Sequence, residues 1–364
     1  MRNSWTLHNM NKNILVIGGY GEVGRVIANH LAIKFPGQVI VAGRDFSKAQ
    51  NLSLETNGKI VPSEFDSLEF DDEYFAQNNV GTSIMCVDSG NVEIAKACIK
   101  NNVNYIDISA NYKILSEIAA IGESTKEVNS TIMLSVGLAP GLSNLLVKHC
   151  QSKSRETYYA NIYVLLGTGE AHGRAAIEWT INNLNERIFS HTRESSTESF
   201  SNRKTTDFGG SIGKRVGYSF NFSDQYVVHK TLRIAEVVTR ICFDSKIVGS
   251  LFYFLKRIGV TKLLKQRNVR STFVDLLRKI KIGSDGFSLK VETYNKKKDL
   301  LSECYLSGNG QGKVTGKVAA IVAEKIINGS TPKGIFHLEQ VFNIEAIVKE
   351  MADCNIKWNV VQCK

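Results

Sequence analysis

The stretch NILVIGGYGEVGRVIANHLA, residues 13–32, decides the fold. An apolar run from Ile14 to Ile17 gives way to glycines, and apolar residues then return at helical spacing. A strand, a turn of the form G-x-G-x-x-G and an amphipathic helix together make the dinucleotide-binding arrangement. Gly19, Gly21 and Gly24 occupy its three glycine positions. The stretch therefore predicts a dinucleotide site where the first strand of a parallel sheet ends.

Each of the three glycines meets a different steric demand. The first permits the tight turn, the second lets the backbone approach a pyrophosphate, and the third lets the helix pack closely on its strand. The start of the helix offers unpaired N–H groups and the positive end of the helix dipole to the phosphates. We therefore expect one short segment to hold the cofactor, with contacts from Gly19, Tyr20, Gly21, Glu22, Val23 and Gly24.

The end of the second predicted strand, QVIVAGR at 38–44, indicates which dinucleotide binds. An acidic residue there would bond the ribose 2′-hydroxyl of NAD, but this strand ends in Arg44. An arginine grips a 2′-phosphate through a bidentate contact worth about 1.5–3 kcal/mol, or roughly 10–100-fold in affinity. Asp45 follows directly and either caps the next helix or holds Arg44 in place. The pattern favours NADP, with NAD as the alternative.

Strand and helix patterns continue to alternate along the N-terminal part of the chain. The segments 82–88, 103–109 and 131–137 are predicted strands, with helical patterns between them. This alternation predicts an α/β fold, a Rossmann-type doubly wound parallel sheet. Ligands of such sheets bind at the carboxyl ends of the strands. We therefore expect further cofactor contacts from Val87, Asp88 and Ser109.

Several motifs together resemble the saccharopine dehydrogenase-like family, which includes saccharopine reductase and lysine dehydrogenase. They are GGYGEVG at 18–24, AGR at 42–44, ACIKNNVNYIDIS at 97–109 and VGLAPGLSNLL at 136–146. The C-terminal stretch 313–340 is similar to the closing helix of the family, with more substitutions. The resemblance covers the first 150 residues well. It implies an NADP-dependent oxidoreductase that acts on a C–N bond of an amino-acid-like substrate, by amine oxidation or imine reduction.

The rhythm of strands and helices fades after Asn144, which predicts a second domain. We expect a dinucleotide-binding domain at 12–148 and an α+β domain for substrate binding and dimerisation at 149–311. The remaining segment, 312–364, is expected to form C-terminal helices that return to the first domain.

Three residues are candidates for catalysis. Asp107 ends a predicted strand near the expected nicotinamide, where it could bond a substrate amine or the ribose, or cap the following turn. Glu170 and His172 lie between glycines at the start of a predicted helix. A histidine there would stay neutral because of the helix dipole and could accept a proton. The alternative is a surface cap with a solvated histidine.

The positive charge of the chain is concentrated in one segment. The formal net charge is +10, and residues 246–281 hold ten lysines and arginines against one acid, Asp275. Three interpretations stay open: a solvated face over core helices, a dimer contact, or adsorption to an anionic membrane surface. Nucleic acid is not expected as a partner, because the rest of the chain is nearly neutral and no nucleic-acid motif accompanies the segment.

The cysteines and the N-terminus predict the compartment. Seven cysteines are scattered along the chain without a C-x-x-C pair, and the first residues contain no apolar segment typical of a signal peptide. We therefore expect a cytoplasmic protein without disulfides and without a bound metal.

Two classes of function follow from these patterns. The first is the NADP-dependent oxidoreductase, acting as a homodimer on a small molecule with amino and carboxylate groups. The second is a redox-silent NADP-binding sensor or interaction protein, because Rossmann folds serve such roles too. A membrane-associated reductase of a lipophilic substrate is a further alternative.

Overall fold

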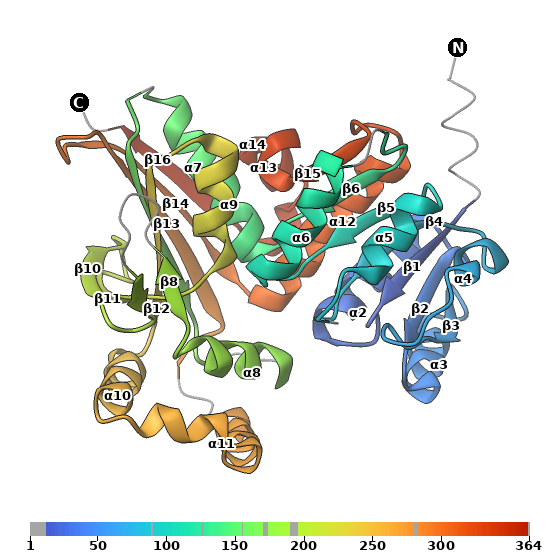
Figure 1. Cartoon of the computed structure of the whole chain (residues 1–364), viewed down its shortest axis with the longest axis horizontal. Helices are drawn as coiled ribbons and strands as arrows, with labels where there is room; N and C mark the ends of the chain where they lie inside the picture. Colours follow the sequence, from blue (N-terminus) through green and yellow to red (C-terminus); the bar gives the residue numbers. More distant parts are fainter. Residues whose placement is uncertain are drawn as a thin grey trace. The chain divides into compact units, whose positions relative to one another are not determined.

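The computed structural model describes residues 12–88, 90–124, 127–154, 156–169, 174–189, 196–279 and 283–362. The chain divides into two units (Figure 1). The first comprises Met1–Leu142 and Gly312–Met351, and the second comprises Ser143–Gln311 and Ala352–Lys364.

The first unit is built on a seven-stranded sheet in the order β15-β6-β5-β4-β1-β2-β3. All neighbouring strands are parallel, so the predicted doubly wound Rossmann-type sheet is confirmed. The strands are β1 (Asn13–Ile17), β2 (Val39–Gly43), β3 (Ile60–Glu64), β4 (Val80–Met85), β5 (Asn104–Asp107), β6 (Thr131–Leu134) and β15 (Gly334–His337).

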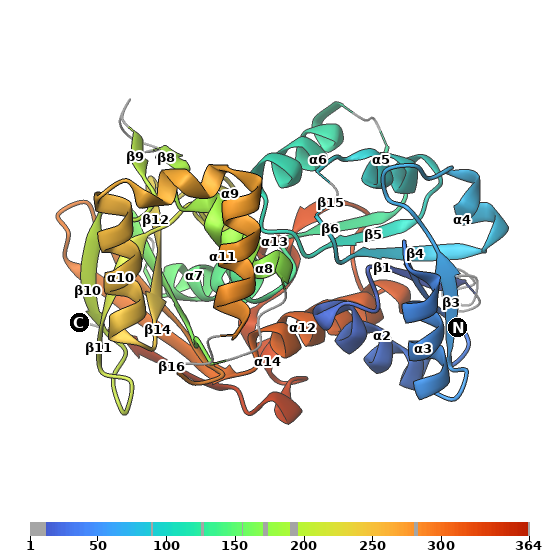
Figure 2. The same cartoon turned by 90° about the horizontal axis from the view of Figure 1, so that it is seen from below.

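Helices cover both faces of this sheet, as Figure 2 shows. The helices of this unit are α2 (Glu22–Lys34), α3 (Phe46–Glu55), α4 (Glu73–Gln77), α5 (Glu93–Lys100), α6 (Tyr112–Ser124), α12 (Gln311–Ile327), α13 (Leu338–Val341) and α14 (Ile344–Val348), with an irregular turn, η1, at Leu138–Leu142. Because both faces are covered, β1 is apolar and buried throughout Ile14–Ile17.

The helices α2 and α12 pack closely in the first unit. A side chain at Gly316 of α12 would lie 2.7 Å from Cβ of Val26, so only glycine fits there. Farther along, the Glu324 carboxylate pairs with His30 and Lys34 of α2. Burial alone would raise the pKa of Glu324, but the hydrogen bonds from His30 and Lys34 outweigh it and lower the pKa. The pairing therefore compensates for the burial of this charge.

The second unit contains a seven-stranded mixed sheet in the order β10-β11-β12-β7-β13-β14-β16. Only the β7–β12 pair is parallel, and the other neighbours are antiparallel. The strands are β7 (Tyr159–Leu166), β10 (Arg203–Asp207), β11 (Lys214–Ser219), β12 (Glu236–Phe243), β13 (Gly286–Tyr294), β14 (Leu300–Asn309) and β16 (Lys357–Gln362), with a separate pair of β8 (Arg187–Phe189) and β9 (Ser196–Glu198).

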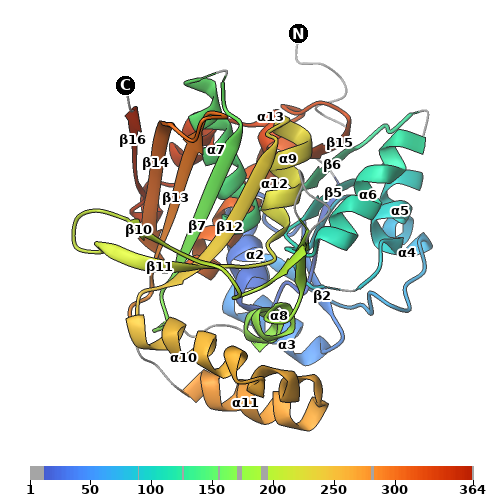
Figure 3. The ribbon, with the colours of Figure 1, turned by 60° about the vertical axis from the view of Figure 1, so that its left-hand side comes forward.

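Different elements cover the two faces of the mixed sheet. Helices α7 and α9 pack on one face. On the other, the β10–β11 hairpin crosses the sheet (Figure 3), and Phe208 packs on Tyr163, Leu165 and Cys242. The helices of this unit are α7 (Ser143–Ser152), α8 (Arg174–Asn183), α9 (Ser223–Leu232), α10 (Lys246–Arg257) and α11 (Arg267–Lys279), with short 3₁₀ turns at η2 (Val260–Lys265) and η3 (Ala352–Cys354).

The C-terminal segment differs from the expectation for 312–364. Helices α12, α13 and α14 belong to the first unit, but β16 pairs with β14 in the second sheet. The division also falls at Leu142, before α7, rather than at residue 148. The reason is that α7 packs on β13 and β14 through its buried side, while β16 completes the edge of that sheet.

The prediction of a chain without disulfides was wrong. Cys150 of α7 and Cys304 of β14 form a disulfide, with their Cα atoms 6.3 Å apart. The two residues are 154 positions apart, and the packing of α7 on the sheet brings them together. Spacing along the sequence carries no signal for such a pair.

Within the described residues, none of the helices has the length and hydropathy that a bilayer-spanning segment requires.

Candidate functional site

The glycine loop lies between the end of β1 and the start of α2. Gly18 has a φ of +76°, and a side chain there would lie 2.5 Å from Cγ1 of Val87. At Gly19 a Cβ would lie 2.8 Å from the carbonyl oxygen of Val16, and at Gly24 it would lie 2.3 Å from that of Gly18. The protein's own packing therefore requires glycine at these three positions.

Gly21 is different, because the protein fills little of the space beside it. A Cβ at this position would meet one atom within 4 Å, the carbonyl oxygen of Gly18 at 3.1 Å. Gly21 is exposed and is the N-cap of α2, with extended backbone and no side-chain cap. The loop thus leaves bare backbone and a helix start facing outward, which is the arrangement that a pyrophosphate needs.

Arg44 stands at the end of β2, beside this loop. Tyr20 fixes the turn, because its ring lies against Gly43 and its hydroxyl accepts a hydrogen bond from the Asp45 N–H (3.2 Å). Asp45 caps α3, accepting from the Lys48 N–H (3.2 Å) and pairing with its ammonium group (3.0 Å). Of the two interpretations of Asp45, the helix cap is therefore the one observed. The Arg44 side chain is exposed.

Lys48 was not singled out from the sequence. Its ammonium group lies 6.0 Å from the centre of the Tyr20 ring, on the same turn as Arg44. Its position four residues after Arg44 could have suggested a second cation beside the ribose.

Asp107 ends β5 and is only 2% exposed. Its Oδ2 accepts from the Tyr105 hydroxyl (2.7 Å) and its Oδ1 from the Ser109 N–H (2.6 Å). Burial raises the pKa of Asp107 to about 6, although these two hydrogen bonds act in the opposite direction. The carboxyl group thus holds the turn after β5, which corresponds to the capping interpretation.

The loops after β4 and β5 lie together at the same edge of the sheet. Asp88 accepts from the Gly90 N–H (3.2 Å) and from the side-chain amide of Asn111 (3.5 Å). The hydroxyl of Ser109 accepts from the Asn111 N–H (3.0 Å). Val87 is exposed apart from its contact with Gly18. These expected cofactor residues therefore share one edge with the glycine loop, because all the strands are parallel.

Two expected contact residues turn toward α12. The Glu22 carboxylate lies next to Gly312, where a Cβ would be 2.7 Å from Oε1. The carbonyl oxygen of Val23 approaches Gly316 in the same way, at 3.0 Å. Any cofactor contact from Glu22 would therefore come from its backbone N–H group.

Glu170 and His172 lie outside the described residues. The loop before them is well anchored, since Asp244 accepts from the Thr168 N–H (3.1 Å) and from the Ser284 N–H (2.6 Å). A hydrogen bond from the Gly169 N–H to the Ser284 carbonyl (2.9 Å) adds to this.

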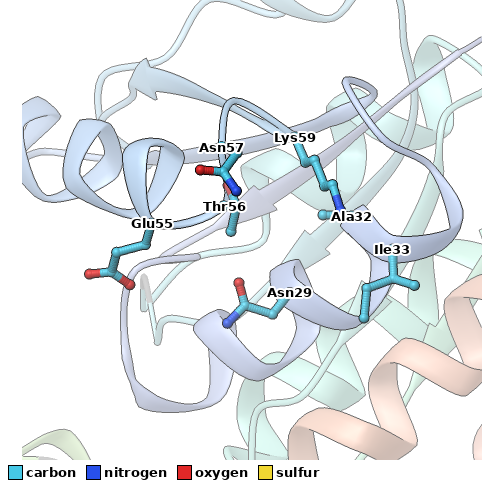
Figure 4. Close-up of a pocket in the computed structure, with 7 residues that line it drawn as sticks. All are labelled: Asn29, Ala32, Ile33, Glu55, Thr56, Asn57 and Lys59. Atoms are coloured by element: carbon cyan, nitrogen blue, oxygen red, sulfur yellow. The ribbon is translucent and has the colours of Figure 1, made fainter.

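A hollow on the first unit lies away from the glycine loop. It is lined by residues in the second half of α2 and around the end of α3, drawn in Figure 4: Asn29, Ala32, Ile33, Glu55, Thr56, Asn57 and Lys59. The 13 residues of α2 span roughly 20 Å, so this hollow and Gly21 lie at opposite ends of the helix. Among the described residues, no group of three or more histidine, cysteine or acidic side chains is placed to hold a metal ion.

Comparison with known proteins identifies the nucleotide-binding part. Residues 14–133 match the family model of the saccharopine dehydrogenase NADP binding domain. The solved structure of apo saccharopine dehydrogenase (L-Glu forming) from Saccharomyces cerevisiae is similar with a TM-score of 0.69, covering 96% of this chain and 100% of that chain at 15% identity. No curated protein matches the sequence.

Two further solved structures are similar at lower scores. A probable dehydrogenase from Thermotoga maritima has a TM-score of 0.43, covering 93% of each chain at 9% identity. An engineered D-amino acid dehydrogenase has a TM-score of 0.44, covering 91% of this chain and 95% of that one at 12% identity.

The fold and the glycine loop define an NADP-binding domain of the dehydrogenase type. Residues 14–133 form a saccharopine dehydrogenase-type NADP-binding domain, and the fold of the chain is similar to that of saccharopine dehydrogenase.

Proposed function

We propose that this chain is an NADP-dependent oxidoreductase that acts on a C–N bond of a small, amino-acid-like substrate. NADP, when bound, supplies or takes up the hydride. The observation that carries the NADP part of the proposal is the space beside Gly21, which the protein leaves open although it fills the space beside Gly19 and Gly24. The C–N bond and the amino-acid-like substrate are supported by the resemblance to saccharopine dehydrogenase.

The residues of the loop fit the phosphate part of NADP. The backbone at Gly21 and the start of α2 would receive the pyrophosphate. The exposed Arg44 would grip the 2′-phosphate, with Lys48 as a second cation. The carboxyl ends of β4 and β5 would border the nicotinamide, through Val87, Asp88 and Ser109.

Asp107 has a positioning role in this proposal. Both of its oxygens are engaged by Tyr105 and Ser109, so the carboxyl group sets the turn that borders the nicotinamide. With a pKa of about 6, it can also take up a proton just below neutral pH. We propose Glu170 and His172 as the groups that exchange a proton with the substrate.

The decisive assay follows NADPH fluorescence with a panel of 2-oxo acids plus amines, and NADP reduction with a panel of amino acids. We expect turnover with at least one member, and a 10²–10⁴-fold lower kcat for His172→Ala if His172 acts as the acid or base. Tight NADPH binding without turnover on the whole panel would instead favour the redox-silent sensor.

Gly21→Val serves as the control for the site itself. The added side chain enters the open space and excludes the pyrophosphate. Within the protein, a Cβ at this position has one neighbour within 4 Å, the Gly18 carbonyl oxygen. We expect loss of NADPH binding and of turnover in a chain that stays folded, with a small decrease in melting temperature because the new Cβ lies 3.1 Å from the Gly18 carbonyl oxygen. Retained affinity would show that the pyrophosphate binds elsewhere.

A further inference from the structure

Within the basic segment 246–281, the described residues form α10, η2 and α11, which lie together at one end of the second unit (Figure 3). Of the fifteen exposed large apolar side chains in the described residues, seven come from this segment. They are Ile247, Leu251, Phe254, Ile258, Val260, Leu263 and Val269, and we call them the outer face. A folded protein seldom gathers so many exposed apolar residues in one place without a partner.

The outer face of α10 is a continuous stripe. Ile247, Leu251, Phe254 and Ile258 follow one another at steps of four, three and four residues, which places them on one side of a helix. Their side chains are 78%, 52%, 57% and 55% exposed, respectively.

The opposite side of α10 already has its packing partners. Gly249 is buried against Tyr218 and Phe243, and the Phe252 ring lies 6.0 Å from that of Phe243. Lys256 also points inward, donating to the carbonyl of Leu184 (2.7 Å) and pairing with Glu198 (3.2 Å). The helix is therefore anchored without the outer face, which is left for another partner.

The charge of the segment selects that partner. Ten lysines and arginines against Asp275 give the segment a charge of +9. In α10, Lys246 and Arg257 are exposed at the two ends of the apolar stripe. An apolar stripe flanked by cations matches the interface of an anionic bilayer, where apolar side chains enter the acyl boundary and cations meet the headgroups.

We propose that the outer face docks on an anionic lipid membrane. A second copy of the chain would bring another +9 against the first, so the charge opposes self-association through this face. A nucleic acid would be held through phosphates and stacked aromatic rings, but six of the seven outer-face residues are aliphatic.

The test uses the full chain and sedimentation with vesicles of phosphatidylcholine, with or without phosphatidylserine. We expect binding only when phosphatidylserine is present, with a strong decrease as salt rises from about 0.1 M to about 1 M. Leu251→Ser/Phe254→Ser should weaken binding roughly tenfold or more. The matched control Ile33→Ser/Leu54→Ser, at two exposed apolar residues of the first unit, should bind like the wild type.

A charge variant tests the second part of the proposal. Lys246→Glu/Arg257→Glu should weaken binding to phosphatidylserine vesicles by roughly tenfold, because each cation near the surface contributes to attraction. The control Lys153→Glu/Lys349→Glu changes two other exposed lysines and should leave binding unchanged.

Three results would overturn the proposal: no binding to phosphatidylserine vesicles, binding that both double variants leave intact, or equal binding to neutral vesicles. A dimer in light scattering that Leu251→Ser/Phe254→Ser dissociates would assign the face to a second copy. If the chain bound an RNA homopolymer, Leu251→Ser/Phe254→Ser abolished that binding, and no vesicle binding were seen, the face would be assigned to nucleic acid.

Discussion

Each unit has a buried carboxylate on one of its strands: Asp107 at the end of β5 and Glu292 within β13. The pKa values of these two groups are shifted in opposite directions. Asp107 in the parallel sheet meets two neutral donors, Tyr105 and the Ser109 N–H, and burial raises its pKa to about 6. For Glu292 in the mixed sheet, burial also acts to raise the pKa, but the Tyr294 hydroxyl and two lysines outweigh it and lower the pKa to about 2.

The neighbours of Glu292 explain the difference. Its carboxylate accepts from Thr206 (2.9 Å) and Tyr294 (2.6 Å), and it pairs with Lys290 (3.0 Å) and Lys204 (3.5 Å). Lys290 also pairs with Glu303 at 3.1 Å. A carboxylate with this many partners is charged at neutral pH and structural, whereas Asp107 can change its protonation near neutral pH.

The largest effect is expected from Glu292→Gln. The variant removes the ion pair between Glu292 and the buried Lys290, which keeps its pair with Glu303. It should lower the free energy of unfolding by about 3–5 kcal/mol. Urea unfolding followed by tryptophan fluorescence measures it, because the described tryptophans Trp179 and Trp358 lie in the second unit.

The matched control is Glu93→Gln, which removes an exposed pair with Lys96 (2.8 Å) and should cost less than about 1 kcal/mol. Because Glu93 lies in the first unit, circular dichroism follows the unfolding of both variants as well. Similar losses for both variants would show that the Glu292 network does not stabilise the second unit beyond an ordinary surface pair.

The pH dependence should have opposite signs at the two carboxylates. The pKa of Asp107 is about 6 in the folded chain against 3.8 for an ordinary aspartate, so its contribution to stability is full below pH 3.8 and is lost as the pH rises through 6. Two pKa units correspond to about 3 kcal/mol. The pKa of Glu292 falls from 4.5 to about 2, so its contribution is lost as the pH falls through that range.

We would measure the unfolding of the wild type and of Asp107→Asn by circular dichroism from about pH 3.8 to about pH 7. The difference between the two isolates the contribution of Asp107 to the pH dependence of stability. The stability of the wild type relative to Asp107→Asn should fall by about 3 kcal/mol over this range. A relative stability that stays constant or rises would mean that Asp107 is not buried as a weak acid.

A smaller effect is expected from Tyr105→Phe. The variant removes the hydroxyl that donates to Oδ2, so the carboxylate form loses about 1.5–3 kcal/mol and the pKa of Asp107 rises further. The loss of stability should be greater at pH 7 than at pH 4. Carboxyl NMR of Asp107 checks the direction, and a lower pKa in Tyr105→Phe would contradict the assignment of the hydrogen bond.

These two carboxylates also show how far the sequence predicts the molecule. The glycine loop, the parallel sheet and the position of Asp107 at a strand end follow from local patterns, because each depends on residues close together in the chain. The pattern GFSLKVETY of β13 gives no comparable signal for Glu292. Its alternation indicates one polar face, but the distant β10–β11 hairpin covers that face and converts it into a buried network.

Other features depend equally on distant contacts. The Cys150–Cys304 disulfide and the pairing of β16 with β14 join segments that are far apart in the chain. The difference between Gly21 and its neighbours likewise requires coordinates, because the motif alone does not show which glycine faces open space.

The most direct test of the nucleotide site is calorimetric titration of NADPH and NADH into the wild type and Arg44→Ala. We expect the wild type to bind NADPH roughly 10–100-fold more tightly than NADH, and Arg44→Ala to lose that preference while its affinity for NADH is nearly unchanged. A wild-type chain that binds neither dinucleotide, or an Arg44→Ala variant that weakens both equally, would contradict the assignment of the glycine loop and Arg44 to NADP.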